Sequence, residues 1–180
     1  MKLSIVIPAY NEAHRLEASL RELAVWLGDT TDVEVLFVND GSLDDTSALL
    51  EAAIAREPRL RLIGYPHNRG KGYAVGQGVA AATGERILFT DADLSMPLSE
   101  LAKLEAALAN ADIAIASRVH HDATVGRPPP RHRELMGRLF NAWVRTVAVP
   151  GFADTQCGFK LFRREAARRV FEHRTLDRFA

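Results

Sequence analysis

The chain has 180 residues, with 23 Lys and Arg, 23 Asp and Glu, and a single cysteine, Cys157. This length fits one domain, and the balanced charge provides no overall field to attract nucleic acid, so we expect no nucleic-acid partner and expect charged ligands to bind at local patches. One cysteine excludes an internal disulfide and a multi-cysteine metal site, and it fits a reducing compartment such as the cytosol.

In chain order, short apolar runs typical of strands alternate with segments whose apolar residues recur at helical spacing. The expected strands are residues 3–9, 33–40, 59–66, 86–91 and 111–118. The expected helices are residues 12–27, a segment after Ser42 that contains 49–54, and residues 71–84 and 98–109. This alternation predicts an α/β fold with a mostly parallel central sheet and helices on both faces.

Three local signals mark the expected helix ends. Ser42 and Asp45 form an N-terminal capping pattern, and Pro97 stands just before the helix at 98–109. Gly84 suits the C-terminal cap of the helix that begins at Lys71.

From Arg118 to Arg133 the alternation stops, because three consecutive prolines and the lack of apolar periodicity predict a long loop. Helical spacing returns over 134–149, and this helix either packs on the core or lies at a membrane interface. A short strand near 159–162 and a last helix follow. We interpret 1–180 as one domain that is incomplete at its C-terminus, and no apolar run reaches the roughly 20 residues of a membrane-spanning helix.

Acidic residues follow two of the predicted strands. Asp40 ends the second strand, and Asp91 and Asp93 come directly after the fourth. In parallel α/β sheets, ligands bind beyond the carboxyl ends of the strands. Carboxylates gathered there repel each other unless a cation compensates, and oxygen ligands suit Mg²⁺ or Mn²⁺ that also binds phosphates. The alternative is that each acid only favours the dipole of a helix N-terminus.

The segment "NRGKGYAVGQG" around Lys71 combines glycines with a basic residue. It lacks the Walker A spacing and the dinucleotide fingerprint. Two interpretations stay open: a glycine-hinged basic turn that contacts a nucleotide diphosphate, or only a tight entry into a helix.

The irregular loop and the helix after it contain five arginines. Guanidinium groups suit phosphate recognition, although a solvated basic loop is at least as good an interpretation of any one of them. They are Arg118, Arg127, Arg131, Arg133 and Arg138. The histidines lack the spacing of a zinc site, and Cys157 has no histidine partner at a suggestive spacing, so we expect Cys157 to be buried.

Six segments together resemble the family 2 glycosyltransferases with a GT-A fold, most closely the dolichyl-phosphate β-glucosyltransferase branch and its bacterial polyprenyl-phosphate relatives. They occur in the family's order and extend over almost the whole chain. They are "SIVIPAYNE", "VLFVNDGSLDDT", "NRGKGYAV", "ILFTDADLSMP", "IASR" and "DTQCGFKLF".

The resemblance implies a role for each matching position. The nucleotide-binding residues would be Pro8, Ala9, Tyr10, Glu12, Asp40, Lys71, Asp91 and Ala92, with Asp91 and Asp93 holding Mg²⁺ or Mn²⁺. The acceptor phosphate would meet Arg118, Arg127, Arg131 and Lys160. Asp93, Arg118 and Asp154 would be the catalytic residues.

By the same resemblance, the protein would transfer a hexose, glucose from UDP-glucose first, to a polyprenyl phosphate of the dolichyl type with inversion. Mannosyl transfer from GDP-mannose, or another family 2 reaction in polysaccharide or glycolipid synthesis, is the alternative. A lipid acceptor implies a cytoplasmic protein in peripheral contact with the cytosolic face of a membrane. A phosphatase of the haloacid dehalogenase type also uses a D-x-D motif, but on its first strand.

Overall fold

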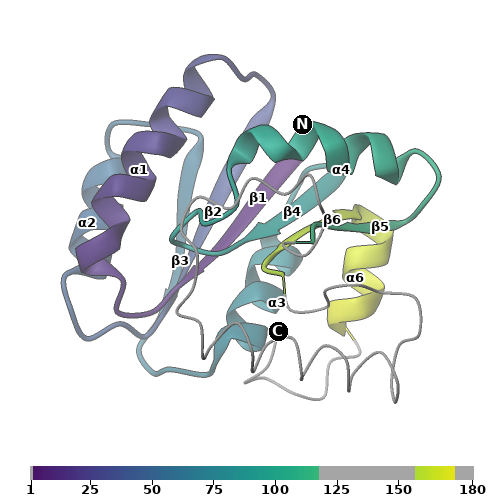
Figure 1. The fold of residues 1–180 in the computed structure, drawn as a ribbon. Helices are drawn as coiled ribbons and strands as arrows, with labels where there is room; N and C mark the ends of the chain where they lie inside the picture. Colours follow the sequence, from purple (N-terminus) through teal and green to yellow (C-terminus); the bar gives the residue numbers. More distant parts are fainter. Residues whose placement is uncertain (1, 118–156, 173–180) are drawn as a thin grey trace, which may run out of the picture.

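The computed structural model describes residues 2–117 and 157–172 (Figure 1). Strands and helices alternate through most of this part of the chain, as the apolar spacing predicts. The elements in chain order are β1 (Leu3–Ala9), α1 (Ala13–Gly28), β2 (Val33–Asp40), α2 (Thr46–Ile54), β3 (Leu60–Tyr65), α3 (Lys71–Ala81), β4 (Arg86–Thr90), the 3₁₀ helix η1 (Leu98–Glu100), α4 (Leu101–Leu108), β5 (Ile113–Ile115), β6 (Phe159–Arg163) and α6 (Arg164–Glu172).

The strands form one six-stranded sheet in the order β3-β2-β1-β4-β6-β5. β1 pairs in parallel with β2 and β4, and β2 pairs in parallel with β3. β6 runs antiparallel between β4 and β5, with Thr90 opposite Phe159 and Phe89 opposite Lys160. This register brings the segment that enters β6 beside the segment that leaves β4.

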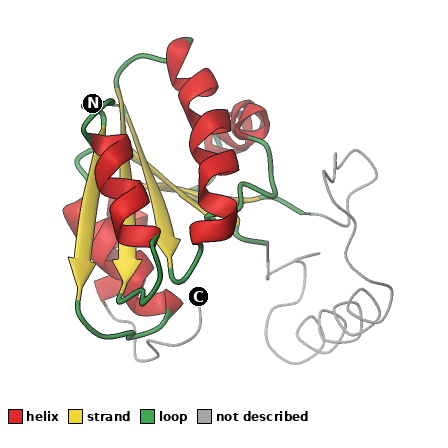
Figure 2. Cartoon of the chain, turned by 90° about the vertical axis from the view of Figure 1, so that its left-hand side faces the viewer, coloured by secondary structure: helices red, strands yellow, loops and turns green. Residues whose placement is uncertain are grey.

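Helices cover both faces of the sheet, as predicted (Figure 2). Alternate strand residues point to opposite faces. Ile5, Ile7 and Phe37 therefore join the apolar residues of α1, α2 and α4 in one core, while Val6 and Leu36 pack with α3 and α6 in the other. Because β1, β2 and β4 are packed on both faces, their carboxyl ends are held in fixed positions.

Two predicted helix ends are wrong. The Ser42 hydroxyl accepts a hydrogen bond from the Asn11 N–H instead of capping α2, and Asp45 makes no side-chain cap bond. α3 ends at Ala81, because Ala82 is extended. Gly84 instead lies against β1, where a Cβ atom would come within 2.5 Å of the Ser4 nitrogen.

Cys157 is fully buried, as predicted. The loop at 118–133, the helix at 134–149 and the site residues Arg118, Arg127, Arg131 and Asp154 lie outside the described residues. Across 2–117 and 157–172, none of the helices has the length and apolar character needed to span a bilayer.

Candidate functional site at the strand ends

A cleft of about 460 Å³ opens at the carboxyl ends of β1, β2 and β4. Its walls come from the β1–α1 loop, the end of β2, the start of α3 and the turn after β4. The lining residues are Pro8, Ala9, Tyr10, Glu12, Asp40, Asn68, Gly70, Lys71, Asp91, Ala92 and Asp93.

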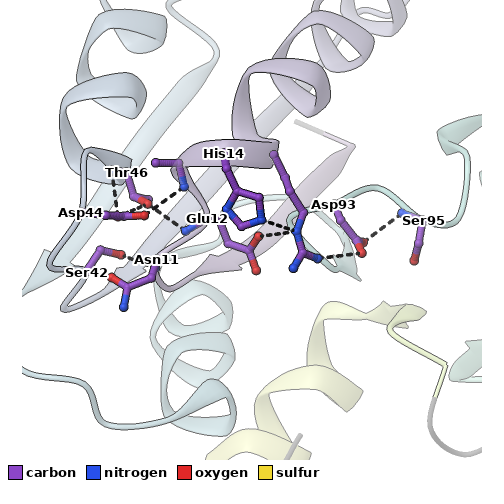
Figure 3. Close-up of polar contacts among 10 residues, drawn as sticks. Asn11, Glu12, His14, Ser42, Asp44, Thr46, Asp93 and Ser95 are labelled. Atoms are coloured by element: carbon purple, nitrogen blue, oxygen red, sulfur yellow. Dashed lines mark hydrogen bonds and ion pairs between the residues drawn. The ribbon is translucent and has the colours of Figure 1, made fainter. Parts of the chain in front are cut away.

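The β1–α1 loop and the start of α1 are held in place by the loop before α2 and the start of α2, whose side chains accept hydrogen bonds from their backbone N–H groups (Figure 3). The Glu12 N–H donates to the Thr46 hydroxyl at 2.9 Å, and the Ala13 N–H donates to Asp44 Oδ2 at 3.1 Å. Asn11 has a positive φ of 53°, and its side chain accepts a hydrogen bond from the Leu43 N–H. These bonds fix the loop that presents Tyr10 and Glu12 to the cleft.

Asp44 connects the starts of α1 and α2, because its carboxylate accepts hydrogen bonds from both. Its Oδ1 accepts hydrogen bonds from the Thr46 N–H and the Thr46 hydroxyl. Partial desolvation would raise the pKa of Asp44, but the hydrogen bonds from Thr46 and from the Ala13 N–H outweigh it, so this pKa lies below its ordinary value. Asp44 therefore remains an anionic acceptor at neutral pH.

Asp40 supports the turn that leads into α3. Its carboxylate accepts hydrogen bonds from the Arg69 N–H at 2.8 Å, the Gly70 N–H at 2.9 Å and the Asn68 amide at 3.0 Å. Gly70 has a φ of 98°, a conformation that side chains disfavour. The tight helix entry is therefore confirmed, because Asp40 holds Gly70 at the start of α3. The next residue, Lys71, lines the cleft, and its contact with a nucleotide diphosphate stays a prediction.

The turn after β4 directs two carboxylates into the cleft. The Leu94 N–H donates to the Asp91 carbonyl oxygen at 3.1 Å, and the Ser95 N–H donates to Asp93 Oδ1 at 3.1 Å. Leu94 has a φ of 44° while its side chain is buried. A bulky residue in this region costs on the order of 1–3 kcal/mol, and such strain is concentrated at functional sites.

Basic side chains partly compensate the two carboxylates. Lys71 Nζ lies 2.7 Å from Asp91 Oδ1, and an Arg15 guanidinium nitrogen lies 3.9 Å from Asp93 Oδ2. In the described part of the chain no three His, Cys, Asp or Glu residues group as a metal site. Asp91 and Asp93 still fit Mg²⁺ or Mn²⁺, because these ions bind through one or two carboxylates and fill other positions with water and phosphate oxygens.

The segment that enters β6 reaches the same turn. A Cβ atom added to Gly158 would overlap Asp91 Oδ2 and lie 2.5 Å from its Cγ, so the backbone at 158 lies directly against this carboxylate. Lys160, two residues on, has its Nζ 6.0 Å from the Phe89 ring centre. Lys160 is absent from the described lining of the cleft.

All nine described residues predicted to bind nucleotide or metal therefore line one cleft. The sequence prediction missed Asn68, Gly70, Arg15 and Gly158. Asn68 and Gly70 lie within the three residues before Lys71, in the segment "NRGKGYAVGQG" that already indicated a basic turn. Gly158 lies within the "DTQCGFKLF" segment that resembles the family. Arg15 had only its spacing of three residues from Glu12, a pattern too common on helices to identify a site.

Known proteins resemble this chain in sequence. A dolichyl-phosphate beta-glucosyltransferase of Mus musculus is 37% identical over 194 residues, which cover 99% of this chain and 60% of that protein. One of Trichomonas vaginalis is 34% identical over 188 residues, covering 98% of this chain and 56% of that protein. The chain thus spans less than two thirds of the length of these curated relatives.

Solved structures resemble it in fold. A mannosyltransferase from Pyrobaculum calidifontis, solved in complex with GDP-Man and Mn²⁺, superposes with a TM-score of 0.65. It is 26% identical, and the match covers 94% of this chain and 46% of that one. The predicted α/β GT-A fold is thereby confirmed.

The family itself follows from a match to most of the chain. The family model of glycosyl transferase family 2 matches residues 4–171 of this chain, and this range includes every residue of the cleft. This match replaces the phosphatase interpretation of the D-x-D motif, which here follows the fourth strand of the chain. The chain belongs to glycosyl transferase family 2.

Proposed function

We propose that this chain carries the donor site of an inverting glycosyltransferase that moves glucose from UDP-glucose to a polyprenyl phosphate of the dolichyl type. The observation that carries the proposal is the cleft itself, where loops from β1, β2, α3 and β4 present nine residues of the family's donor motifs. The names of the relatives, which are 34% and 37% identical over nearly all of this chain, support glucose and dolichyl phosphate.

On the donor side, the β1–α1 loop would contact the nucleoside through Pro8, Ala9, Tyr10 and Glu12. The Tyr10 side chain suits this role because it lines the cleft while 42% exposed. Asp40 is almost fully buried and its carboxylate already accepts three hydrogen bonds from the turn at 68–70. Its contribution to base or ribose binding would therefore include positioning that turn.

Asp91 and Asp93 would hold Mg²⁺ or Mn²⁺, and Lys71 would contact the diphosphate. A divalent cation supplies charge stabilisation for the leaving diphosphate. Lys71 and Arg15 add positive charge beside Asp91 and Asp93, where negative charge would increase as UDP departs. Asp93 would keep its orientation through the Ser95 N–H.

On the acceptor side, a phosphate oxygen of the lipid would attack the anomeric carbon of glucose. A new carbon–oxygen bond forms while the bond from that carbon to the UDP oxygen breaks, and UDP leaves with the electron pair. A phosphate monoester has a second pKa of about 6, so it is mostly dianionic near neutral pH and requires no strong base. Asp154 would then position groups, and Arg118, Arg127, Arg131 and Lys160 would bind the acceptor phosphate.

A lipid acceptor also implies where the protein works. We propose that it contacts a membrane peripherally from the cytosolic side, because a polyprenyl chain stays in the bilayer while its phosphate reaches the water. The single buried cysteine is consistent with a reducing compartment.

Mannosyl transfer from GDP-mannose is the second candidate. It is favoured by one observation, the 26% identity with the Pyrobaculum calidifontis mannosyltransferase that was solved with GDP-Man and Mn²⁺. A direct comparison of the two sugar nucleotides separates the two candidates.

The test is a transfer reaction with detergent-dispersed polyprenyl phosphate, Mg²⁺, and UDP-glucose or GDP-mannose, with the glycolipid identified by mass. We expect hexosyl polyprenyl phosphate from UDP-glucose and much less from GDP-mannose. Product from GDP-mannose alone would select the second candidate. Hydrolysis of polyprenyl phosphate without sugar transfer would contradict both.

A further inference from the structure

The ion pair between Lys71 and Asp91 uses a carboxylate oxygen that would also suit a divalent cation. Lys71 Nζ lies 2.7 Å from Asp91 Oδ1, within direct hydrogen-bonding distance. We propose that Lys71 is an exchangeable counter-ion of Asp91: it competes with a divalent cation for Oδ1 and so keeps cation affinity low until a nucleotide diphosphate binds. This inference rests on the proposed role of Asp91 as a cation ligand.

Of the two carboxylate oxygens of Asp91, Oδ2 is the one nearer the backbone at Gly158. A Cβ atom at that position would overlap Oδ2 and would lie 2.8 Å from Oδ1. The main chain of Asp91 is held by the hydrogen bond from the Leu94 N–H to the Asp91 carbonyl oxygen. A cation that bound Asp91 through Oδ1, the oxygen farther from Gly158, would compete with the ammonium group that already contacts this oxygen.

Lys71 can leave Asp91 without leaving the cleft. It is the first residue of α3, and Asp40 fixes the preceding Gly70 through a hydrogen bond of 2.9 Å. The root of the side chain is thus anchored, whereas the side chain itself is 43% exposed. A displaced ammonium group would remain beside the turn at 91–93, where it can bind a diphosphate as a point charge.

The pair is a poor candidate for a purely structural contact. Lys71 and Asp91 are both partly exposed, and ion pairs of this kind contribute little to folding stability. Removing the lysine charge should therefore leave the fold intact while changing what binds at Asp91. Competition also predicts coupling: a nucleotide diphosphate that attracts Lys71 frees Oδ1, so the nucleotide and the cation should each strengthen binding of the other.

The test measures Mn²⁺ binding by electron paramagnetic resonance, with and without UDP, for the natural sequence, Lys71→Met, Lys71→Arg and Lys103→Met. Without UDP, we expect Lys71→Met to bind Mn²⁺ about three- to fivefold more tightly, the change expected for losing one partly exposed competing charge. Lys71→Arg keeps the charge and should bind Mn²⁺ as weakly as the natural sequence. UDP should strengthen Mn²⁺ binding less in Lys71→Met than in the natural sequence.

Lys103→Met is the matched control. Lys103 forms a similar short ion pair with Glu100 on η1 and α4, at 2.8 Å, and it lies outside the cleft lining. It should leave Mn²⁺ affinity unchanged, and thermal unfolding of each variant checks that it folds. Equal or weaker Mn²⁺ binding by folded Lys71→Met would overturn the competition alone. Failure of the natural sequence to bind Mn²⁺ even with UDP would overturn the proposed donor site as well.

Discussion

Residues in and beside the cleft hold in place the loops that line it. Asp40 orients the turn at 68–70, and Asp44 joins the starts of α1 and α2. Residue types at strand ends were enough to predict that Asp40, Asp91 and Asp93 share one site, and the family resemblance added Lys71 to it. Their partners were not predictable, because hydrogen bonds across 28–31 positions of sequence depend on how the loops meet in space. Gly158 was missed as a specific contact for the same reason.

Asp44→Ala should weaken UDP binding although Asp44 lies outside the cleft lining, because it releases the N–H groups of Ala13 and Thr46. The free energy of unfolding should fall by about 1–2 kcal/mol, since each lost hydrogen bond contributes roughly 0.5–1.5 kcal/mol. Calorimetric titration with UDP and urea unfolding measure the two effects.

The matched control is Asp45→Ala, the neighbouring exposed acid that makes no side-chain cap bond. It should change the unfolding free energy by less than about 0.5 kcal/mol. Asp44→Asn retains one acceptor oxygen and should recover part of the loss. An equal effect of the two alanine variants would remove Asp44 from its positioning role.

At the scale of elements, a second polar cluster joins the starts of the strands at the far end of the sheet from the cleft. Buried Glu34 on β2 accepts hydrogen bonds from the Ser4 hydroxyl on β1, the Thr83 N–H before β4 and Arg61 on β3. Burial would raise the pKa of Glu34, but these hydrogen bonds outweigh it and lower the pKa to about 2. This cluster explains why α3 ends early: Thr83 and Gly84 are needed at Glu34 and Ser4.

Glu34→Gln should lower the free energy of unfolding by roughly 2 kcal/mol at pH 7, because the charged acceptor of several hydrogen bonds is lost. The folded pKa lies below the ordinary value of 4.5, so the stabilisation is complete above about pH 4.5 and is lost as the pH falls toward 2. Urea unfolding at pH 7 and pH 3 should therefore show a smaller deficit at pH 3.

Exposed Glu22 on α1 provides the control for this prediction. Glu22→Gln should change the unfolding free energy by less than about 0.5 kcal/mol at pH 7. A deficit of Glu34→Gln that stayed constant between pH 7 and pH 3 would show that the carboxylate charge is not what stabilises this end of the sheet.

At the scale of the whole molecule, strand and helix order, the parallel core of the sheet and the coverage of both faces followed from apolar periodicity. The antiparallel direction of β6 did not, because a period of two residues is the same in either direction. The direction of β6 affects the site, because it places Gly158 against Asp91, although the two residues are 67 positions apart in the sequence. The match to glycosyl transferase family 2 identifies the family, and residues of several family motifs meet in one cleft.

The cleft should bind a nucleotide diphosphate together with a divalent cation held by Asp91 and Asp93. The most direct measurement is the thermal unfolding midpoint with UDP, with Mn²⁺, and with both, for the natural sequence, Asp91→Asn and Asp112→Asn. Asp112 is an exposed acid outside the cleft lining and serves as the control.

Ligands that bind only the folded state stabilise it by about 2.7 kcal/mol at one hundred times their dissociation constant, which raises the midpoint by several degrees. We predict this rise with UDP and Mn²⁺ together, much less with either alone, no joint effect in Asp91→Asn, and the full effect in Asp112→Asn. An equal rise with UDP in the absence of Mn²⁺, or an undiminished joint rise in Asp91→Asn, would contradict the claim.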